Sequence, residues 1–311
     1  MRAVLVDPAA PGHLKLGEAP DPAPRSNQAV VRIKAISLNL GEVRRARRSE
    51  AGALLGWDLA GVIEEAAPDG SGPAPGTRVV GLVLSGAWAE LAAVDSGMLA
   101  PLPDEVSFAS AATLPVAGLT ALYALEQGGQ LLGRRVLVTG ASGGVGLFAT
   151  QLANLSGATV TGLIRQKHYA DLVRKCGAAA VVVGERGDGA ANHGPFHCIL
   201  DSVGGEVLSD CLQLLAPGGV LVNYGVSAGE QATIEVGQFF RVGRARYYGL
   251  YLFTEFGRRR ASDGLGVLLG LLAAGRLDVH IGAEGGLGEL GELAERLYSR
   301  KIPGKAVIHV D

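Results

Sequence analysis

Short apolar runs separated by proline- and glycine-rich stretches occupy the first third of the chain. The runs are AVLV, AVVRIKAIS, LAGVIEEA, RVVGLVL and WAELAAV, and the stretches between them include EAPDPAPRSNQ and APDGSGPAPGTR. Strands that alternate with turn signals at this spacing are typical of a compact barrel or sandwich. We therefore expect residues 1–112 to form a β-rich domain.

From residue 113 the pattern changes to helical segments that alternate with short apolar runs. ASAATLPVAGLTALYALEQ, HYADLVRKCGA and EVLSDCLQLLAPGG have helical composition, the last with a glycine stop, whereas VLV, TVTGLI, AVVV, HCILDSV and VLVNYG are typical of strands. Repeated strand–helix units imply a doubly wound parallel sheet with helices on both faces.

The pattern becomes mixed again after Gly225. RARYYGLYLF predicts a final strand at a sheet edge, available for pairing with a second subunit. Two helices are expected in LGVLLGLLAAGRLD and LGELGELAERLYSRK. The closing KAVIHVD predicts a strand that returns to the first domain.

The segment RVLVTGASGGVG joins a buried strand, Val136–Val138, to a helix through a glycine-rich turn. Gly140, Gly143 and Gly146 have the spacing GxxGxxG. Glycines allow the backbone to approach phosphates, and the helix N-terminus offers free N–H groups and a favourable dipole. In this strand–turn–helix context, we interpret the turn as a dinucleotide pyrophosphate site.

The end of the next strand indicates which nicotinamide cofactor the site prefers. NAD-binding folds place an acidic residue about 20 positions after the glycines, where it accepts the ribose 2′-hydroxyl. This chain instead has Arg165, Lys167 and Tyr169 in the run RQKHY, and its first acid is Asp171. A guanidinium and an ammonium suit a 2′-phosphate, so the sequence predicts NADPH.

Composition narrows the class of protein. A formal charge of −2 gives no global field that recruits nucleic acid or an anionic membrane. The apolar run near the N-terminus is too short for a signal peptide or a membrane span, so a cytoplasmic protein is expected. Cys176, Cys198 and Cys211 form no CxxC pair, which argues against a disulfide framework and a structural zinc site.

One basic cluster, Arg44, Arg45, Arg47 and Arg48, leaves two interpretations open. It is either a solvated turn or helix end, or a rim that attracts an anionic substrate or a cofactor phosphate.

Two dehydrogenase families share a glycine turn of this kind. TGASGGVG fits the TGxxxGxG pattern of short-chain dehydrogenases, but that family also needs a YxxxK pair. Val173, Ala228, Leu252 and Ile302 stand four residues after tyrosines that follow the turn, and no YxxxK pair exists.

The whole chain instead resembles the zinc-independent quinone oxidoreductase and enoyl reductase branch of the medium-chain dehydrogenase/reductase superfamily. The matching strings are AISLNLGEVR, LLGWDLAGVI, GAWAELAAV, LPVAGLTALYAL, VLVTGASGGVGLFATQLA and IPGKAVIHV. The resemblance implies a GroES-like catalytic domain of residues 1–112 and 255–311. It also implies an inserted Rossmann NADPH-binding domain of residues 113–254, with the active site in the cleft between them.

The resemblance further implies roles for individual residues. Asn39 would lie beside the nicotinamide, where its amide holds a ribose hydroxyl or the substrate oxygen, and Tyr224 is a candidate proton donor alongside Tyr251 and solvent. Lys305 would contact a phosphate or ribose, with a solvated loop lysine as the alternative. The other implied cofactor contacts are Thr120, Gly143, Gly144, Val145, Asp201, Val203, Tyr224 and Gly225. Zinc members carry a cysteine ligand where this chain has Ile36–Asn39, so no metal site is expected.

Three departures fall on the substrate side of the family pattern. Glu42 replaces an aspartate, Arg44 replaces a frequent tyrosine, and the loop between Arg48 and Leu54 is short. The expected function is NADPH-dependent hydride transfer to a quinone or an α,β-unsaturated carbonyl, in a homodimer joined through the edge strand. The alternative is a non-enzymatic NADPH-binding protein, structural or RNA-associated, although the near-neutral charge counts against RNA.

Overall fold

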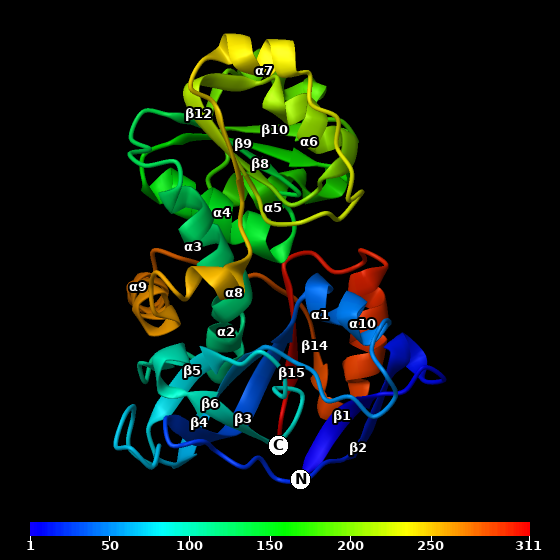
Figure 1. The fold of residues 1–311 in the computed structure, drawn as a ribbon, viewed down its shortest axis with the longest axis vertical. Helices are drawn as coiled ribbons and strands as arrows, with labels where there is room; N and C mark the ends of the chain where they lie inside the picture. The colour runs from blue at the N-terminus through cyan, green and yellow to red at the C-terminus, as the bar shows by residue number, and fades with distance from the viewer. The chain divides into compact units, whose positions relative to one another are not determined.

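The computed structural model describes residues 1–311 and divides into two compact units. The β-rich unit contains residues 1–119 and 256–311, and the parallel-sheet unit contains residues 120–255. The parallel-sheet unit is therefore an insertion in the chain of the β-rich unit. Figure 1 shows the two ends of the chain, blue and red, both contributing to the β-rich unit.

The β-rich unit is built on a seven-stranded sheet with the order β14-β15-β3-β4-β5-β7, and β6 also pairs with β3. β1 and β2 form a separate two-stranded sheet. The long strand β3 holds the sheet together, because it pairs with β4, β6 and β15. The strands are β1 (Arg2–Val6), β2 (Leu14–Glu18), β3 (Gln28–Leu38), β4 (Asp58–Glu65), β5 (Arg78–Leu82), β6 (Leu91–Asp95), β7 (Leu99–Pro101), β14 (Ile281–Gly286) and β15 (Lys305–His309).

The C-terminal segment returns to this sheet, which confirms the prediction for KAVIHVD. β15 runs antiparallel to β3, with Ala306 opposite Leu38, and the red β15 lies beside the blue β3 in Figure 1. Helix α10 (Leu290–Tyr298) packs against the same unit through Leu290, Leu293 and Ala294, which are buried in its core. The N- and C-terminal parts of the chain therefore share one hydrophobic core.

The helices of the β-rich unit are short except for α9. They are α1 (Leu40–Ala46), α2 (Phe108–Ala112) and α9 (Ala261–Ala273), besides α10. The apolar helix α9 packs on β5 and β7. No helix in the structure combines the length and the apolar character needed to cross a membrane.

The parallel-sheet unit has six parallel strands in the order β10-β9-β8-β11-β12-β13, as the Rossmann prediction requires. Helices α4 and α5 pack along β8 to β10, and α6 packs on β12. The strands are β8 (Arg135–Thr139), β9 (Thr159–Ile164), β10 (Ala180–Val183), β11 (Phe196–Asp201), β12 (Leu215–Asn223) and β13 (Arg246–Gly249). The helices are α3 (Leu119–Glu126), α4 (Gly144–Leu155), α5 (Ala170–Lys175), α6 (Gly205–Leu212), α7 (Val236–Val242) and α8 (Leu252–Glu255).

Two expected helices have different bounds in the structure. α6 ends at Leu212, because the buried Leu215 is the first residue of β12 and pairs with Phe196 of β11. The glycines that follow Leu215 therefore lie inside a strand. The helical segment around Pro115 is divided by a π-helical turn, Leu114–Gly118. Proline has no N–H for the regular helical hydrogen bond, which explains the interruption.

The close approach of β3 and β4 generates a stability prediction. A Cβ at Gly61 would overlap the carbonyl oxygen of Arg32 on the neighbouring strand. We expect Gly61→Ala to lower the free energy of unfolding by about 1–3 kcal/mol, measured by urea denaturation. Gly17→Ala is the matched control in β2, since its Cβ would meet only Leu5 at 3.5 Å, and it should change stability by less than about 1 kcal/mol. Equal losses for both variants would contradict this account of the sheet.

Candidate functional site

The carboxyl ends of the parallel strands gather most of the sequence-predicted residues at one edge of the sheet. β8 lies between β9 and β11, with Thr139 opposite Leu163 and Val138 opposite Leu200. The chain winds from β8 toward β10 and then returns to β11 on the other side, so the connections diverge beside β8. Ligands of open parallel sheets bind in the crevice that such a divergence creates.

The glycine turn at the end of β8 has a backbone that other residues could not adopt. Gly140 has φ of +60°, in the left-handed region, and a Cβ there would overlap the Ser202 hydroxyl. A Cβ at Gly146 would overlap the carbonyl oxygen of Gly140. The turn is therefore closed by its first and last glycines, and this close packing brings the start of α4 against the end of β8.

The N-terminus of α4 is open for an anion. Gly143 is its N-cap, is exposed, and provides no side chain to cap the helix. The first N–H groups of a helix, here those of Gly144, Val145 and Gly146, have no acceptor within the helix. These N–H groups and the helix dipole attract negative charge. Gly143, Gly144 and Val145, the residues predicted to meet a pyrophosphate, therefore lie at this open helix N-terminus.

Two cations without partners stand at the end of β9, at the same edge of the sheet. Arg165 and Lys167 are exposed, and neither side chain forms an ion pair or hydrogen bond in the structure. The nearby Arg174 behaves differently, since it pairs with Asp171 at 2.8 Å. The ring of Tyr169 packs against His168 with centroids 4.0 Å apart. The charges at Arg165 and Lys167 are therefore available for a phosphate.

Asp201, at the end of β11, directs its carboxylate into the protein. It accepts hydrogen bonds from the Thr139 hydroxyl at 2.6 Å, the Gly204 N–H at 2.9 Å and the Asn223 amide at 2.8 Å, and it is fully buried. The N–H of Val203 donates to it as well, at 3.2 Å. Asp201 therefore ties the ends of β8, β11 and β12 together and offers no free carboxylate to a ligand.

Tyr224 follows β12, and its hydroxyl is buried without a hydrogen-bond partner. Burial, followed by the charge of Asp201, raises the pKa of Tyr224 above its usual range. The phenol therefore stays neutral, and so protonated, at physiological pH. Gly225 lies close to Ser202, since a Cβ there would be 2.8 Å from the Ser202 carbonyl oxygen. Tyr251, the other tyrosine candidate, is 63% exposed.

Asn39 and Lys305 meet inside the β-rich unit. The Lys305 ammonium donates to Asn39 Oδ1 at 2.6 Å and to the Leu38 carbonyl at 3.0 Å. It also pairs with Asp58 at 3.3 Å, and its side chain is 4% exposed. The alternative of a solvated loop lysine is therefore wrong. Thr120, a further predicted contact, lies buried in the first turn of α3 within the parallel-sheet unit.

Asp58 is the centre of this cluster, and the sequence analysis did not single it out. It accepts hydrogen bonds from Ser37 Oγ and Asn39 Nδ2, both at 2.7 Å, and from the Val116 N–H at 2.9 Å. The sequence carried two signals for it, an acid immediately before the apolar segment LAGVIEEA and its place in the matching string LLGWDLAGVI. Ser37 lies in the segment that carries a cysteine ligand in zinc relatives, and here its hydroxyl is committed to Asp58.

Glu42 adds a second buried carboxylate next to Asp58. It closes a capping box at the start of α1, accepting from the Asn39 N–H at 2.7 Å, and also accepts from the Trp57 N–H at 2.9 Å. Burial, followed by the charge of Asp58, raises the pKa of Glu42 to about 8, although Lys305 acts in the opposite direction. The longer side chain of glutamate thus fixes the turn between β3 and α1.

The basic cluster on α1 divides between two environments. Arg47 pairs with Glu295 and lies over the ring of Tyr298, 4.0 Å from its centroid, so it fastens α1 to α10. Arg45 is exposed and donates to the Leu84 carbonyl at 3.3 Å, and Arg48 is exposed. The structural interpretation therefore holds for Arg47, and the exposed arginines remain open to either interpretation.

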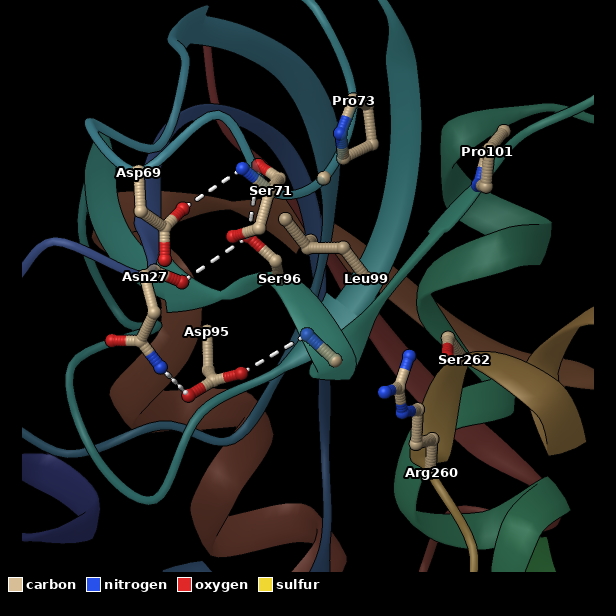
Figure 2. A pocket seen from close by; sticks show the side chains of 12 residues that line it. Asn27, Asp69, Ser71, Pro73, Asp95, Ser96, Leu99, Pro101, Arg260 and Ser262 are labelled. Atoms are coloured by element: carbon tan, nitrogen blue, oxygen red, sulfur yellow. Dashed lines mark hydrogen bonds between the residues drawn. The ribbon is translucent and has the colours of Figure 1, made fainter.

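One pocket of the β-rich unit lies at the other end of β3 from Asn39, roughly 35 Å along the strand. It has a volume of about 630 Å³ and is lined by polar loops (Figure 2). Asp95 accepts from Asn27 at 2.5 Å and from the Gly97 N–H at 3.0 Å, and Ser71 bonds Ser96 at 2.9 Å. These groups hold the turns together. No group of three or more histidine, cysteine or acidic side chains is placed to hold a metal ion.

Comparison with known proteins gives two family matches. Residues 25–104 match the alcohol dehydrogenase GroES-like domain, and residues 144–262 match the family described as zinc-binding dehydrogenase. These spans fall on the strands of the β-rich unit and on the glycine turn with the strands that follow it.

Individual relatives agree with these matches. The chain is 36% identical to the spectinabilin polyketide synthase system protein NorB of Streptomyces orinoci, over 80% of this chain but only 12% of that protein. It is 33% identical to the trans-enoyl reductase tazE of Aspergillus terreus, over 64% of this chain and 77% of that protein. The structure of Escherichia coli quinone oxidoreductase complexed with NADPH has the same fold, with a TM-score of 0.90, 23% identity and coverage of 99% and 100% of the two chains.

The raised pKa of Glu42 predicts how stability depends on pH. A carboxyl group that holds its proton more tightly when folded contributes stability at low pH, and this contribution is lost as the pH rises through the folded pKa, here from about 5 to about 8. We expect Glu42→Gln to flatten the decline of the free energy of unfolding across this window. Urea denaturation at several pH values measures it, with Glu292→Gln on the exposed side of α10 as the control. Parallel curves for wild type and Glu42→Gln would contradict the assignment.

Proposed function

The chain belongs to the quinone and enoyl reductase branch of the medium-chain dehydrogenase/reductase superfamily, and from this premise we propose that it is an NADPH-dependent reductase. Its substrate would be an electron-poor double bond conjugated to a carbonyl, as in enones, enoyl thioesters and quinones. The observation that carries the proposal is the edge of the parallel sheet, where an open helix N-terminus stands beside the unpaired Arg165 and Lys167.

The residues at this edge fit a phosphorylated dinucleotide. The N–H groups of Gly144 and Val145, at the uncapped start of α4 after Gly143, would bind the pyrophosphate. Arg165 and Lys167 would bind the 2′-phosphate, and Tyr169 would border the same site. Asp201 would act by holding Val203 and the end of β12 in place, whereas Tyr224 and Gly225 would form the wall of the site. Thr120 and Asn39 are proposed for the nicotinamide side, where Lys305 would act through Asn39, since its ammonium donates to protein groups.

When bound, NADPH supplies the hydride, and the protein supplies orientation and electrostatics. Negative charge builds on the substrate carbonyl oxygen as hydride arrives, so hydrogen-bond donors near that oxygen lower the barrier. Reduction of an enone also needs a proton at carbon. Because the hydroxyl of Tyr224 is buried, we propose that solvent or the exposed Tyr251 is the better proton source.

The substrate class rests on the relatives. NorB belongs to a polyketide synthase system, and tazE is a trans-enoyl reductase. The name of tazE favours an enoyl substrate, whereas the E. coli structure, at 23% identity, supports only the fold. Nothing in the structure or among these relatives favours the non-enzymatic alternative.

Three further predictions belong to the same proposal. β13 is an edge strand of the parallel sheet, and we propose that a second copy pairs with it to form a homodimer. The reaction would proceed without zinc, which is supported by the hydrogen bond from Ser37 to Asp58. The protein would act in the cytoplasm.

A panel of acceptors tests the proposed reaction. We expect NADPH oxidation, followed by its absorbance, with at least one member of a panel of quinones, enones and enoyl thioesters. Gly143→Asp is a sharp control, because an aspartate at the N-cap stabilises α4 while it occupies the N–H groups and repels phosphate. It should keep or raise the melting temperature and abolish turnover. Tight NADPH binding without turnover of any acceptor would contradict the proposal.

Cofactor choice depends on Arg165. Loss of a charge-assisted contact to the 2′-phosphate should raise the Kd for NADPH by roughly 10- to 100-fold in Arg165→Ala and leave the Kd for NADH nearly unchanged. Isothermal titration calorimetry measures both constants. Arg174→Ala removes an exposed arginine that is already paired with Asp171, and it should leave both constants unchanged. An equal loss for both cofactors in Arg165→Ala would show that this guanidinium does not recognise the 2′-phosphate.

A further inference from the structure

The side-chain amide of Asn39 has almost no free hydrogen-bonding capacity. An asparagine side chain offers two N–H donors and two acceptor lone pairs on its oxygen. Both donors of Asn39 are used, toward Asp58 Oδ2 at 2.7 Å and toward Glu42 Oε1 at 3.3 Å. Its oxygen accepts from Lys305 at 2.6 Å. One acceptor lone pair is all that remains for a ligand.

Lys305 determines which way this amide points. An ammonium group has three donors and cannot accept, so whatever faces it must present an oxygen. The three donors of Lys305 go to the Leu38 carbonyl, to Asn39 Oδ1 and to Asp58 Oδ2. A flipped Asn39 amide would place its N–H groups against this ammonium and its oxygen against two acceptor oxygens, Asp58 Oδ2 and Glu42 Oε1. Both contacts would be repulsive, so only one orientation is compatible with the cluster.

The position of Lys305 is itself fixed by the fold. It is the first residue of β15, and the preceding Gly304 has φ of +65°, with no room for a Cβ beside the His280 carbonyl. β15 pairs with β3, which ends at Leu38, next to Asn39. The pairing of β15 with β3 therefore places the ammonium at the end of β3, although Lys305 and Leu38 are 267 residues apart in the chain.

We propose that Lys305 is a positioning residue that makes Asn39 an acceptor-only contact for a hydroxyl group of the bound cofactor. The proposal rests on the proposed function, because only the family resemblance places Asn39 beside the nicotinamide. The proposal selects between the two roles that the sequence suggested for Asn39, a contact to a ribose hydroxyl and a contact to the substrate oxygen. A ribose hydroxyl can donate to the remaining lone pair, whereas a substrate carbonyl oxygen has no hydrogen to donate and finds no free N–H on Asn39.

The test separates the orientation of Asn39 from the stability of the cluster. Lys305→Met alone leaves the buried Asp58 carboxylate without a counter-charge, and it is expected to be unstable. The double variant Lys305→Met with Asp58→Asn removes one charge of each sign. Its new side-chain amide at position 58 offers an N–H donor to the Asn39 oxygen, so the flipped orientation of Asn39 is no longer disfavoured. Lys301→Met, an exposed lysine in the preceding loop, is the matched control. Thermal melting identifies the variants that remain folded.

Two measurements report on the orientation of the Asn39 side-chain amide, an NMR signal and the Kd for NADPH. The chain has five asparagines, so asparagine-selective ¹⁵N labelling gives five side-chain amide signals, and Asn39→Ala identifies the one of interest. In the wild type and in Lys301→Met, we expect the Asn39 signal to exchange slowly with water. In the folded double variant, it should shift and exchange at least about tenfold faster, and the Kd for NADPH should rise by about tenfold with the loss of one oriented hydrogen bond.

The outcomes distinguish this proposal from the proposed function. An unchanged Asn39 signal, or an unchanged Kd for NADPH, in a folded double variant would overturn the positioning role. If the double variant does not fold, Lys305→Gln combined with Asp58→Asn is measured in the same way against the same criteria. If the wild type reduces no acceptor while the signal and the Kd change as expected, the proposed reaction fails and the role of Lys305 stands.

Discussion

The buried pair between Lys305 and Asp58 is the interaction on which the β-rich unit depends. It joins strands that lie 247 residues apart in sequence, on either side of the inserted parallel-sheet unit. A buried ion pair adds little net stability, because desolvation offsets most of the attraction, but loss of one partner typically costs about 3–5 kcal/mol. The pair therefore acts mainly as a constraint on register. It holds the end of β3, the start of β4 and the start of β15 at one point.

The two units use the same physical device to build their candidate binding residues. Asp58 in one and Asp201 in the other are fully buried carboxylates that accept hydrogen bonds from several chain segments. The oxygens of each carboxylate are occupied by hydrogen bonds that order the loops around it. Other groups in the two units keep hydrogen-bonding capacity or charge for a ligand. They are one lone pair on Asn39, the first N–H groups of α4, and the cations Arg165 and Lys167. In each unit, a buried carboxylate therefore orders the loops, and separate groups stay available to a ligand.

Local patterns in the sequence predicted most of the fold. The buried strands of the parallel sheet are continuous apolar runs, and the glycine turn needs specific residues, so both leave a clear local signal. β14 was not predicted, because its sequence IGAEGG contains three glycines and no apolar run, and it is a strand only through its pairing with β15. The end of α6 was placed wrongly because Leu215 has the apolar character of a helix face and is recruited by β11 instead.

The sequence carries clearer signals for the proposed cofactor contacts than for the buried groups that support the candidate site. The roles proposed for Arg165 and Gly143 depend on the chemistry of those residues at their own positions, and such a signal can be recognised locally. The role of Asp58 arises only when β3, β4 and β15 come together, and no spacing along the chain encodes it. For the same reason Lys305 was proposed as a ligand contact, whereas in the folded protein its three donors are directed inward.

The most direct test of the account follows the hydride itself. NADPH deuterated at C4 is incubated with the protein and an enone or enoyl thioester that it reduces, and the product is analysed by mass spectrometry. We expect deuterium to be transferred to the carbon β to the carbonyl, and we expect this transfer to be lost in Gly143→Asp. The experiment is run twice, with each of the two hydrogens at C4 labelled in turn. A reduced product that carries no deuterium in either case would contradict hydride transfer from the cofactor at this site.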